Sequence, residues 1–90
     1  MMKAIRIDGS RLCEKKAAIG YLAEIFEFDR HYVRNLDALW DTLWDIDDHY
    51  ELRVSKDQLD IWLSTIDGYR VFNVIMQFAQ SSKRLKVYFE

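Results

Sequence analysis

The chain has 90 residues and a formal net charge of −2 at pH 7, and 50% of its residues are hydrophobic and 14% aromatic. This length predicts a single domain over residues 1–90, and the hydrophobic content excludes a disordered chain. Cys13 is the only cysteine, which excludes an intrachain disulfide and a thiolate metal cluster. The sequence shows neither a signal-peptide pattern nor the roughly 20 apolar residues of a membrane span. We therefore expect a cytoplasmic protein that does not bind membranes.

The charge is distributed unevenly along the chain. The segment from Asp29 to Glu51 holds seven acidic and two basic residues, a net −5, whereas the remainder holds eight acidic and eleven basic residues, a net +3. An acidic segment attracts basic partners and repels the phosphates of nucleic acids. This asymmetry predicts a basic protein as the partner and no direct binding of nucleic acid.

The sequence predicts an α/β protein whose elements follow the order β-α-α-β-α-α-β. Alternation of apolar and polar side chains predicts three strands, at residues 3–8, 50–54 and 84–89. Apolar residues at helical spacing predict about four helices, at residues 14–28, from Asn35 to a closing segment at 45–49, from Ser55 to Asp67 and Gly68, and at 69–82. Asn35 and Ser55 are the expected N-caps. Helical crossovers between strands favour a three-stranded parallel sheet with right-handed connections.

The segment 35–41, with the sequence NLDALWD, carries the most informative pattern in the chain. On a helix its leucines form one apolar stripe, and three aspartates form a separate acidic stripe, namely Asp37, Asp41 and Asp45. Trp40 and Trp44 lie between the two stripes. Carboxylates four residues apart repel each other by a few tenths of a kcal/mol, so stability alone does not favour this arrangement. The pattern is typical either of a solvated acidic face or of a surface that meets a cationic partner.

This segment, extended to Leu43, resembles the signature of the barstar family, the small intracellular inhibitors of the secreted ribonuclease barnase. The length of the chain and the order of its elements are similar to the family throughout. The resemblance implies a barstar-like fold in which the first strand is central, which is a strand order of 2-1-3. It also implies an inhibitor that has no enzymatic activity and no cofactor, and that is a monomer when free.

The resemblance further implies how the acidic helix acts on a ribonuclease. A carboxylate placed in the active site accepts charge-assisted hydrogen bonds from the cations that normally hold RNA phosphate. Asp41 is the expected central anchor, Asp37 flanks it, and Trp40 supports the helix. The other expected contact residues surround this anchor and are Asn35, His31, Tyr32, Val33, Trp44 and Asp45.

Several positions depart from the family pattern. His31 stands where the family has an interface tyrosine, Val33 replaces a loop glycine, and Trp44 replaces a small hydroxyl residue. Gln77 or Gln80 stands where the family presents a glutamate. These departures predict the same binding mode with a different or altered target. The partner is then a secreted or toxin ribonuclease or, alternatively, another basic protein bound by an antitoxin or immunity module.

Other chemistries find little support in the sequence. His31 and His49 with the nearby aspartates match no metal-ligand spacing, and the segment lacks the glycine and distal glutamate of a calcium loop. No Ser-His-Asp arrangement, glycine-rich phosphate loop or Cys-His pair is recognisable. We therefore expect no metal site and no enzymatic activity, with His31 and Asp41 as an acid–base pair in the least favoured alternative.

Overall fold

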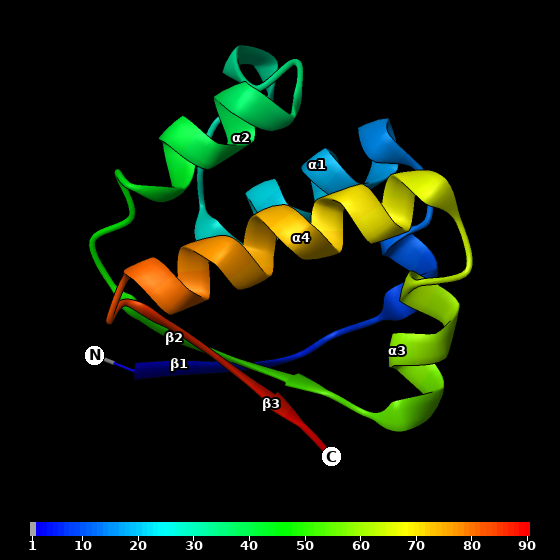
Figure 1. The fold of residues 1–90 in the computed structure, drawn as a ribbon. Coiled ribbons are helices and arrows are strands. Elements are labelled where there is room, and N and C mark those ends of the chain that lie inside the picture. The colour runs from blue at the N-terminus through cyan, green and yellow to red at the C-terminus, as the bar shows by residue number, and fades with distance from the viewer. Residues whose placement is uncertain (1) are drawn as a thin grey trace.

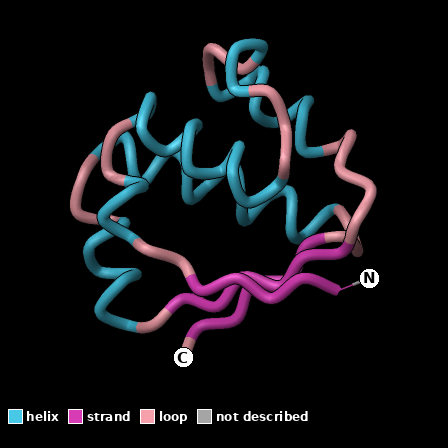
Figure 2. Tube along the Cα trace, turned by 180° about the vertical axis from the view of Figure 1, so that it is seen from behind, coloured by secondary structure: helices cyan, strands magenta, loops and turns pink. Residues whose placement is uncertain are grey.

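The computed structural model describes residues 2–90 and shows a three-stranded parallel sheet with the helices gathered on one face (Figures 1 and 2). The strands are β1 (Met2–Arg6), β2 (His49–Val54) and β3 (Leu85–Phe89). The helices are α1 (Lys15–Phe26), α2 (Leu36–Leu43), α3 (Lys56–Trp62) and α4 (Ile66–Ser81). Short 3-10 helices precede and follow α1, at η1 (Gly9–Leu12) and η2 (Arg30–Tyr32). The predicted α/β class, with three parallel strands and four helices, is confirmed.

The structure corrects the expected order of the strands. The observed order is β1-β2-β3, so β2 is central, whereas the order 2-1-3 would have placed β1 at the centre. Right-handed crossovers that step in the same direction across a sheet place their helices on the same face. In an order of 2-1-3 the second crossover would run in the opposite direction, and helices would cover both faces. The one-sided helix layer in Figure 1 agrees with the observed order.

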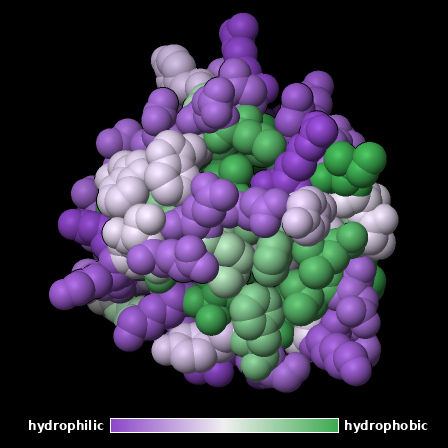
Figure 3. Space-filling model, in the orientation of Figure 1, coloured by the Kyte–Doolittle hydropathy of each residue, from purple (hydrophilic) through white to green (hydrophobic). Residues whose placement is uncertain are grey.

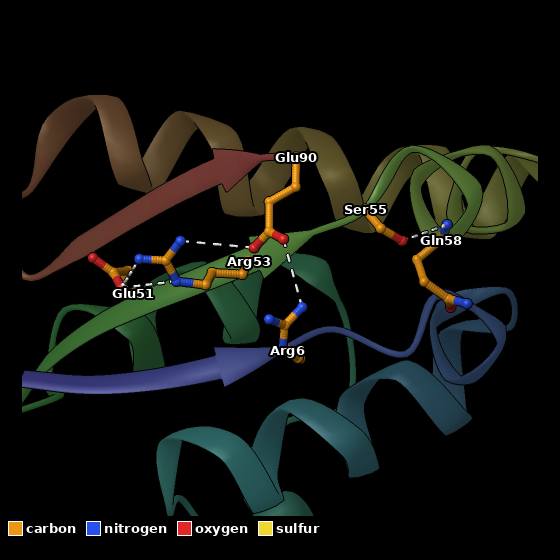
Figure 4. Close-up of polar contacts among 6 residues, drawn as sticks. All are labelled: Arg6, Glu51, Arg53, Ser55, Gln58 and Glu90. Carbon is orange, nitrogen blue, oxygen red and sulfur yellow. Dashed lines mark hydrogen bonds and ion pairs between the residues drawn. The ribbon is translucent and has the colours of Figure 1, made fainter.

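The central strand presents charged side chains to the uncovered face of the sheet, so this strand does not need a second helix layer. The burial pattern of β2 alternates, so that Tyr50, Leu52 and Val54 are buried while Glu51 and Arg53 stay partly exposed. The Arg53 guanidinium lies 2.8 Å from a Glu51 carboxylate oxygen and 3.7 Å from one of Glu90 (Figure 4). These ion pairs replace the apolar contacts that a second helix layer would require.

The core lies between the sheet and the helices. Phe26 of α1 packs edge-on against Tyr50 of β2, with ring centroids 4.8 Å apart. α4 contributes Val71, Ile75 and Phe78 to this core, all fully buried. None of the helices in residues 2–90 has the length and apolar composition needed to cross a lipid bilayer.

The boundary between α3 and α4 differs from the prediction at Gly68. The sequence predicted a break at Asp67 and Gly68, but α4 begins at Ile66, with Thr65 as its N-cap. A Cβ atom on Gly68 would lie 1.9 Å from the carbonyl oxygen of Trp62. Gly68 therefore permits a close approach of two backbones and does not end a helix.

Candidate partner-binding site

The start of α2 is fixed by local sequence. Asn35 is the N-cap, as predicted, and its Oδ1 accepts a hydrogen bond from the Ala38 N–H at 2.8 Å. Leu39 and Leu43 are fully buried, so the leucine stripe faces the core as the periodicity indicated. This anchoring leaves the opposite face of the helix directed toward solvent.

Three aspartates occupy that solvent side. Asp37 lies in the first turn of α2, Asp41 lies one turn later, and Asp45 follows the helix, which ends at Leu43, earlier than predicted. After Asp41 the backbone changes from α-helical to 3-10-type hydrogen bonds. The Trp44 N–H donates to the Asp41 carbonyl, and the Asp45 N–H donates to the Thr42 carbonyl. All three aspartate side chains are exposed. Within residues 2–90 none of their carboxylates forms an ion pair.

Other acidic residues of the segment 29–51 stabilise the fold instead. The Asp29 carboxylate accepts a hydrogen bond from the His31 N–H at 2.9 Å. Asp48 pairs with Lys3 at 3.1 Å, and the hydrogen bond from Lys3 holds the pKa of Asp48 below its ordinary value. Glu51 pairs with Arg53. The acidic segment therefore divides into carboxylates engaged within the fold and carboxylates without an ion pair within residues 2–90, which belong to Asp37, Asp41 and Asp45 at α2 and to Asp47 beyond it.

Aromatic rings fix the end of α2 to α4. The Trp44 ring lies edge-on to Phe78 at 5.0 Å and to Trp40 at 5.8 Å between centroids. Trp40 is partly buried and also contacts Phe78, at 6.2 Å. Trp40 thus supports the helix, as expected. The role of Phe78 as the shared support was missed, because contacts between distant helices leave no local signal in the sequence.

The loop before α2 presents two of its three predicted contact side chains. Tyr32 is 81% exposed and His31 is also exposed. Val33 is only 4% exposed and has an extended backbone with φ −111°, so its side chain packs in the core. The Val33 side chain is therefore not available to a partner, whereas those of His31 and Tyr32 are.

The surface around α2 differs in hydropathy from the surface over α4 and β3. Figure 3 shows hydrophilic side chains over much of the upper part of the molecule, where α2 lies, and apolar ones over α4 and β3. Gln77 and Gln80 of α4 are exposed. Within residues 2–90, no group of three or more His, Cys, Asp or Glu side chains is placed to hold a metal ion. The solvent side of α2 thus presents an anionic surface.

Comparison with known proteins assigns the family. A search of curated proteins finds no significant match to this chain. A scan of protein families matches residues 2–86 to the family described as "Barstar (barnase inhibitor)". The match covers almost the whole chain and includes all of α2, its preceding loop and Trp44. It supports a role like that of a barnase inhibitor at the level of the family, which has a ribonuclease as its partner. The chain belongs to the barstar family of barnase inhibitors.

Proposed function

We propose that this protein inhibits a barnase-type ribonuclease by placing the acidic side of α2 in the cationic active site of the enzyme. The observation that carries the proposal is that Asp37, Asp41 and Asp45 are exposed and have no ion pair within residues 2–90. A partner cation therefore meets these carboxylates without first breaking an internal ion pair. Asp41 is the central anchor, because Asp37 also serves the first turn of the helix.

The rigidity of α2 supports the same mechanism. A capped helix held by buried leucines and by the Trp40–Trp44–Phe78 cluster loses little conformational freedom on binding. Unpaired carboxylates on such a helix accept charge-assisted hydrogen bonds in place of RNA phosphate and present no bond to cleave. Complementary charge also speeds association, and the barnase–barstar pair is itself a known example of this effect.

In this proposal the protein acts in the cytoplasm, as a free monomer that protects its cell from a secreted or toxin ribonuclease. A second candidate keeps the binding mode but changes the partner to a basic protein without ribonuclease activity. Two residues at the contact surface support this alternative, because they differ from the family pattern. Trp44 is 47% exposed at the end of α2, where the family has a small hydroxyl residue, and His31 replaces an interface tyrosine.

The test is to purify the tagged protein from its native host and to assay the co-purified partner for RNA cleavage. Stoichiometric inhibition of that cleavage supports the proposal. Asp41→Asn is expected to weaken binding by about a hundredfold or more, as loss of a buried charge contact does. The matched control is Asp60→Asn, because Asp60 is an exposed aspartate on α3, away from α2.

Two results would contradict the proposal in different ways. A partner without nuclease activity whose binding still depends on Asp41 would favour the second candidate. Binding that is equally tight in wild type and Asp41→Asn would exclude the α2 mechanism for both candidates.

A further inference from the structure

A second surface lies between the first turns of α1 and the loop around η2, and it shares His31 with the expected partner-contact residues. It is a cleft of about 370 Å³, which we call the α1–η2 cleft. Its lining residues come from these two segments and are Lys15, Lys16, Ile19, Gly20, Arg30, His31, Val33 and Arg34. Volumes of this order are typical of small-molecule sites.

The side chains that line the cleft are strongly cationic. Lys15, Lys16, Arg30 and Arg34 are basic side chains, and no carboxylate is part of the lining. Within residues 2–90, none of these four cations has a carboxylate oxygen within ion-pair distance. Four other cations are paired, namely Lys3, Arg6, Arg11 and Arg53. Five more have no ion pair within residues 2–90 but do not line the cleft, namely Lys56, Arg70, Lys83, Arg84 and Lys86. The cleft therefore gathers unneutralised cations in a chain whose net charge is −2.

Three carboxylates near the cleft are engaged by backbone amides, and a fourth, that of Glu24, pairs with Arg11 at 3.0 Å and also lies in the field of Arg30. Glu14 accepts hydrogen bonds from the N–H groups of Lys16 and Ala17 and caps α1. Asp67 accepts from the Lys15 N–H at 3.1 Å, and Asp29 accepts from the His31 N–H at 2.9 Å. Glu14, Asp67 and Asp29 thus hold the backbone at the edge of the cleft. The four cationic side chains remain exposed and are open to an anion from solution.

Gly20 contributes to the shape of the cleft. It lies in the interior of α1, where glycine costs about 1 kcal/mol relative to alanine. A Cβ atom at this position would lie 3.4 Å from Nη1 of Arg30. The guanidinium therefore lies against the glycine, which brings a planar cation close to the helix at the edge of the cleft.

We propose that the α1–η2 cleft binds a phosphate-bearing small molecule of nucleotide size. Two arginines supply planar forks that match phosphate oxygens, and two lysines add compact charges. Ile19 and Val33 also line the cleft, but their side chains are only 4% exposed, so the site is built on contacts between its cations and phosphate. The unpaired carboxylates of α2 repel a long polyanion, which favours a mononucleotide over RNA. This proposal does not depend on the partner of α2.

The test is calorimetric titration of the full chain with AMP, with pyrophosphate and with adenosine at low ionic strength. We expect saturable binding of AMP and pyrophosphate and none of adenosine. The double variant Lys16→Gln/Arg30→Gln should raise the dissociation constant by about tenfold or more, as loss of charge-assisted contacts does. The control is Lys56→Gln/Arg70→Gln, which removes two exposed cations from α3 and α4 that have no ion pair within residues 2–90.

Several outcomes would overturn the proposal. One is an equal loss of affinity in both double variants, which would show diffuse attraction to the whole surface. Absence of saturable binding, adenosine binding as tightly as AMP, or tighter binding of single-stranded RNA would also exclude it. Unfolding midpoints of both variants show whether they remain folded. Asp41→Asn should leave AMP binding undiminished, which separates this site from that of the proposed inhibition.

Discussion

Trp44 packs edge-on against Phe78, with ring centroids 5.0 Å apart and an interplanar angle of 81°. The contact joins the end of α2 to α4, yet Trp44 keeps 47% of its surface exposed. An aromatic ring that is anchored on one side and open on the other offers a partner a large, rigid contact area. Trp44 therefore both anchors the end of the acidic helix on α4 and shapes the exposed surface beside Asp41.

Replacing Trp44 with alanine should lower the free energy of unfolding by about 1–2 kcal/mol. This is less than the roughly 3–5 kcal/mol lost when a fully buried tryptophan is removed, because about half of the ring already meets solvent. Urea denaturation measures the difference. Tyr32→Ala is the matched control, since Tyr32 is an aromatic residue with 81% exposure, and its change should stay within about 0.5 kcal/mol. An equal loss in both variants would contradict the anchoring role of Trp44.

Asp41→Asn should raise stability slightly while it weakens partner binding. The substitution relieves repulsion from Asp37 four residues earlier, and it removes a negative charge from the last turn of α2, where the helix dipole disfavours it. The expected gain in the free energy of unfolding is about 0.3–0.5 kcal/mol. Urea denaturation at low salt checks the sign. A loss of stability would show that Asp41 serves the fold, contrary to its assigned role.

Two helix glycines should respond to alanine in opposite directions. Gly68→Ala places a Cβ 1.9 Å from the Trp62 carbonyl oxygen, a clash with backbone that should cost about 3 kcal/mol. Gly20→Ala places its Cβ 3.4 Å from the flexible end of Arg30, so the helix propensity of alanine should dominate, with a gain of up to about 1 kcal/mol. Thermal unfolding of both variants measures this contrast. Similar effects at both positions would refute the difference in packing.

Local signals in the sequence predicted the elements well. Asn35 and Ser55 cap their helices as expected, because an N-cap depends on residues within one turn. The leucine stripe of α2 is likewise a local pattern, and it placed the aspartates on the solvent side. Gly68 was misread because a glycine that ends a helix and one that permits close packing look the same in sequence.

Long-range relations were predicted less well. The strand order came from the family resemblance, although β2 carried a signal against it. Glu51 and Arg53 alternate with buried residues, which indicates a sheet covered on one face only and therefore crossovers that step in one direction. The α1–η2 cleft was also missed. Its cations lie at positions 15–16 and 30–34, and only the fold brings these two segments together.

The Lys3–Asp48 ion pair predicts a dependence of stability on pH at both ends of the scale. The Lys3 ammonium lies 2.8 Å from Glu27 and 3.1 Å from Asp48. Hydrogen bonds to Glu27 and Asp48 raise the pKa of Lys3 above its ordinary value of 10.5. The hydrogen bond from Lys3 lowers the pKa of Asp48 below its ordinary 3.8.

Stabilisation from Asp48 is therefore present above pH 3.8 and lost as the pH falls through the lower pKa that Asp48 has in the folded state. Stabilisation from Lys3 is present below pH 10.5 and lost as the pH rises through the higher folded value.

Comparison of wild type with Lys3→Gln in urea denaturation across pH tests this dependence. The difference in the free energy of unfolding should be constant between about pH 5 and 9 and should shrink in acid, once the carboxylates are protonated. Lys86→Gln is the control, because Lys86 is exposed on the same sheet and has no ion pair within residues 2–90. Its difference from wild type should not vary with pH in this way. The Lys3 ammonium also lies 5.6 Å from the centre of the Tyr50 ring, a contact that acid leaves intact. A Lys3→Gln difference that persists undiminished at pH 2 would therefore assign the role of Lys3 to Tyr50 and not to the carboxylates.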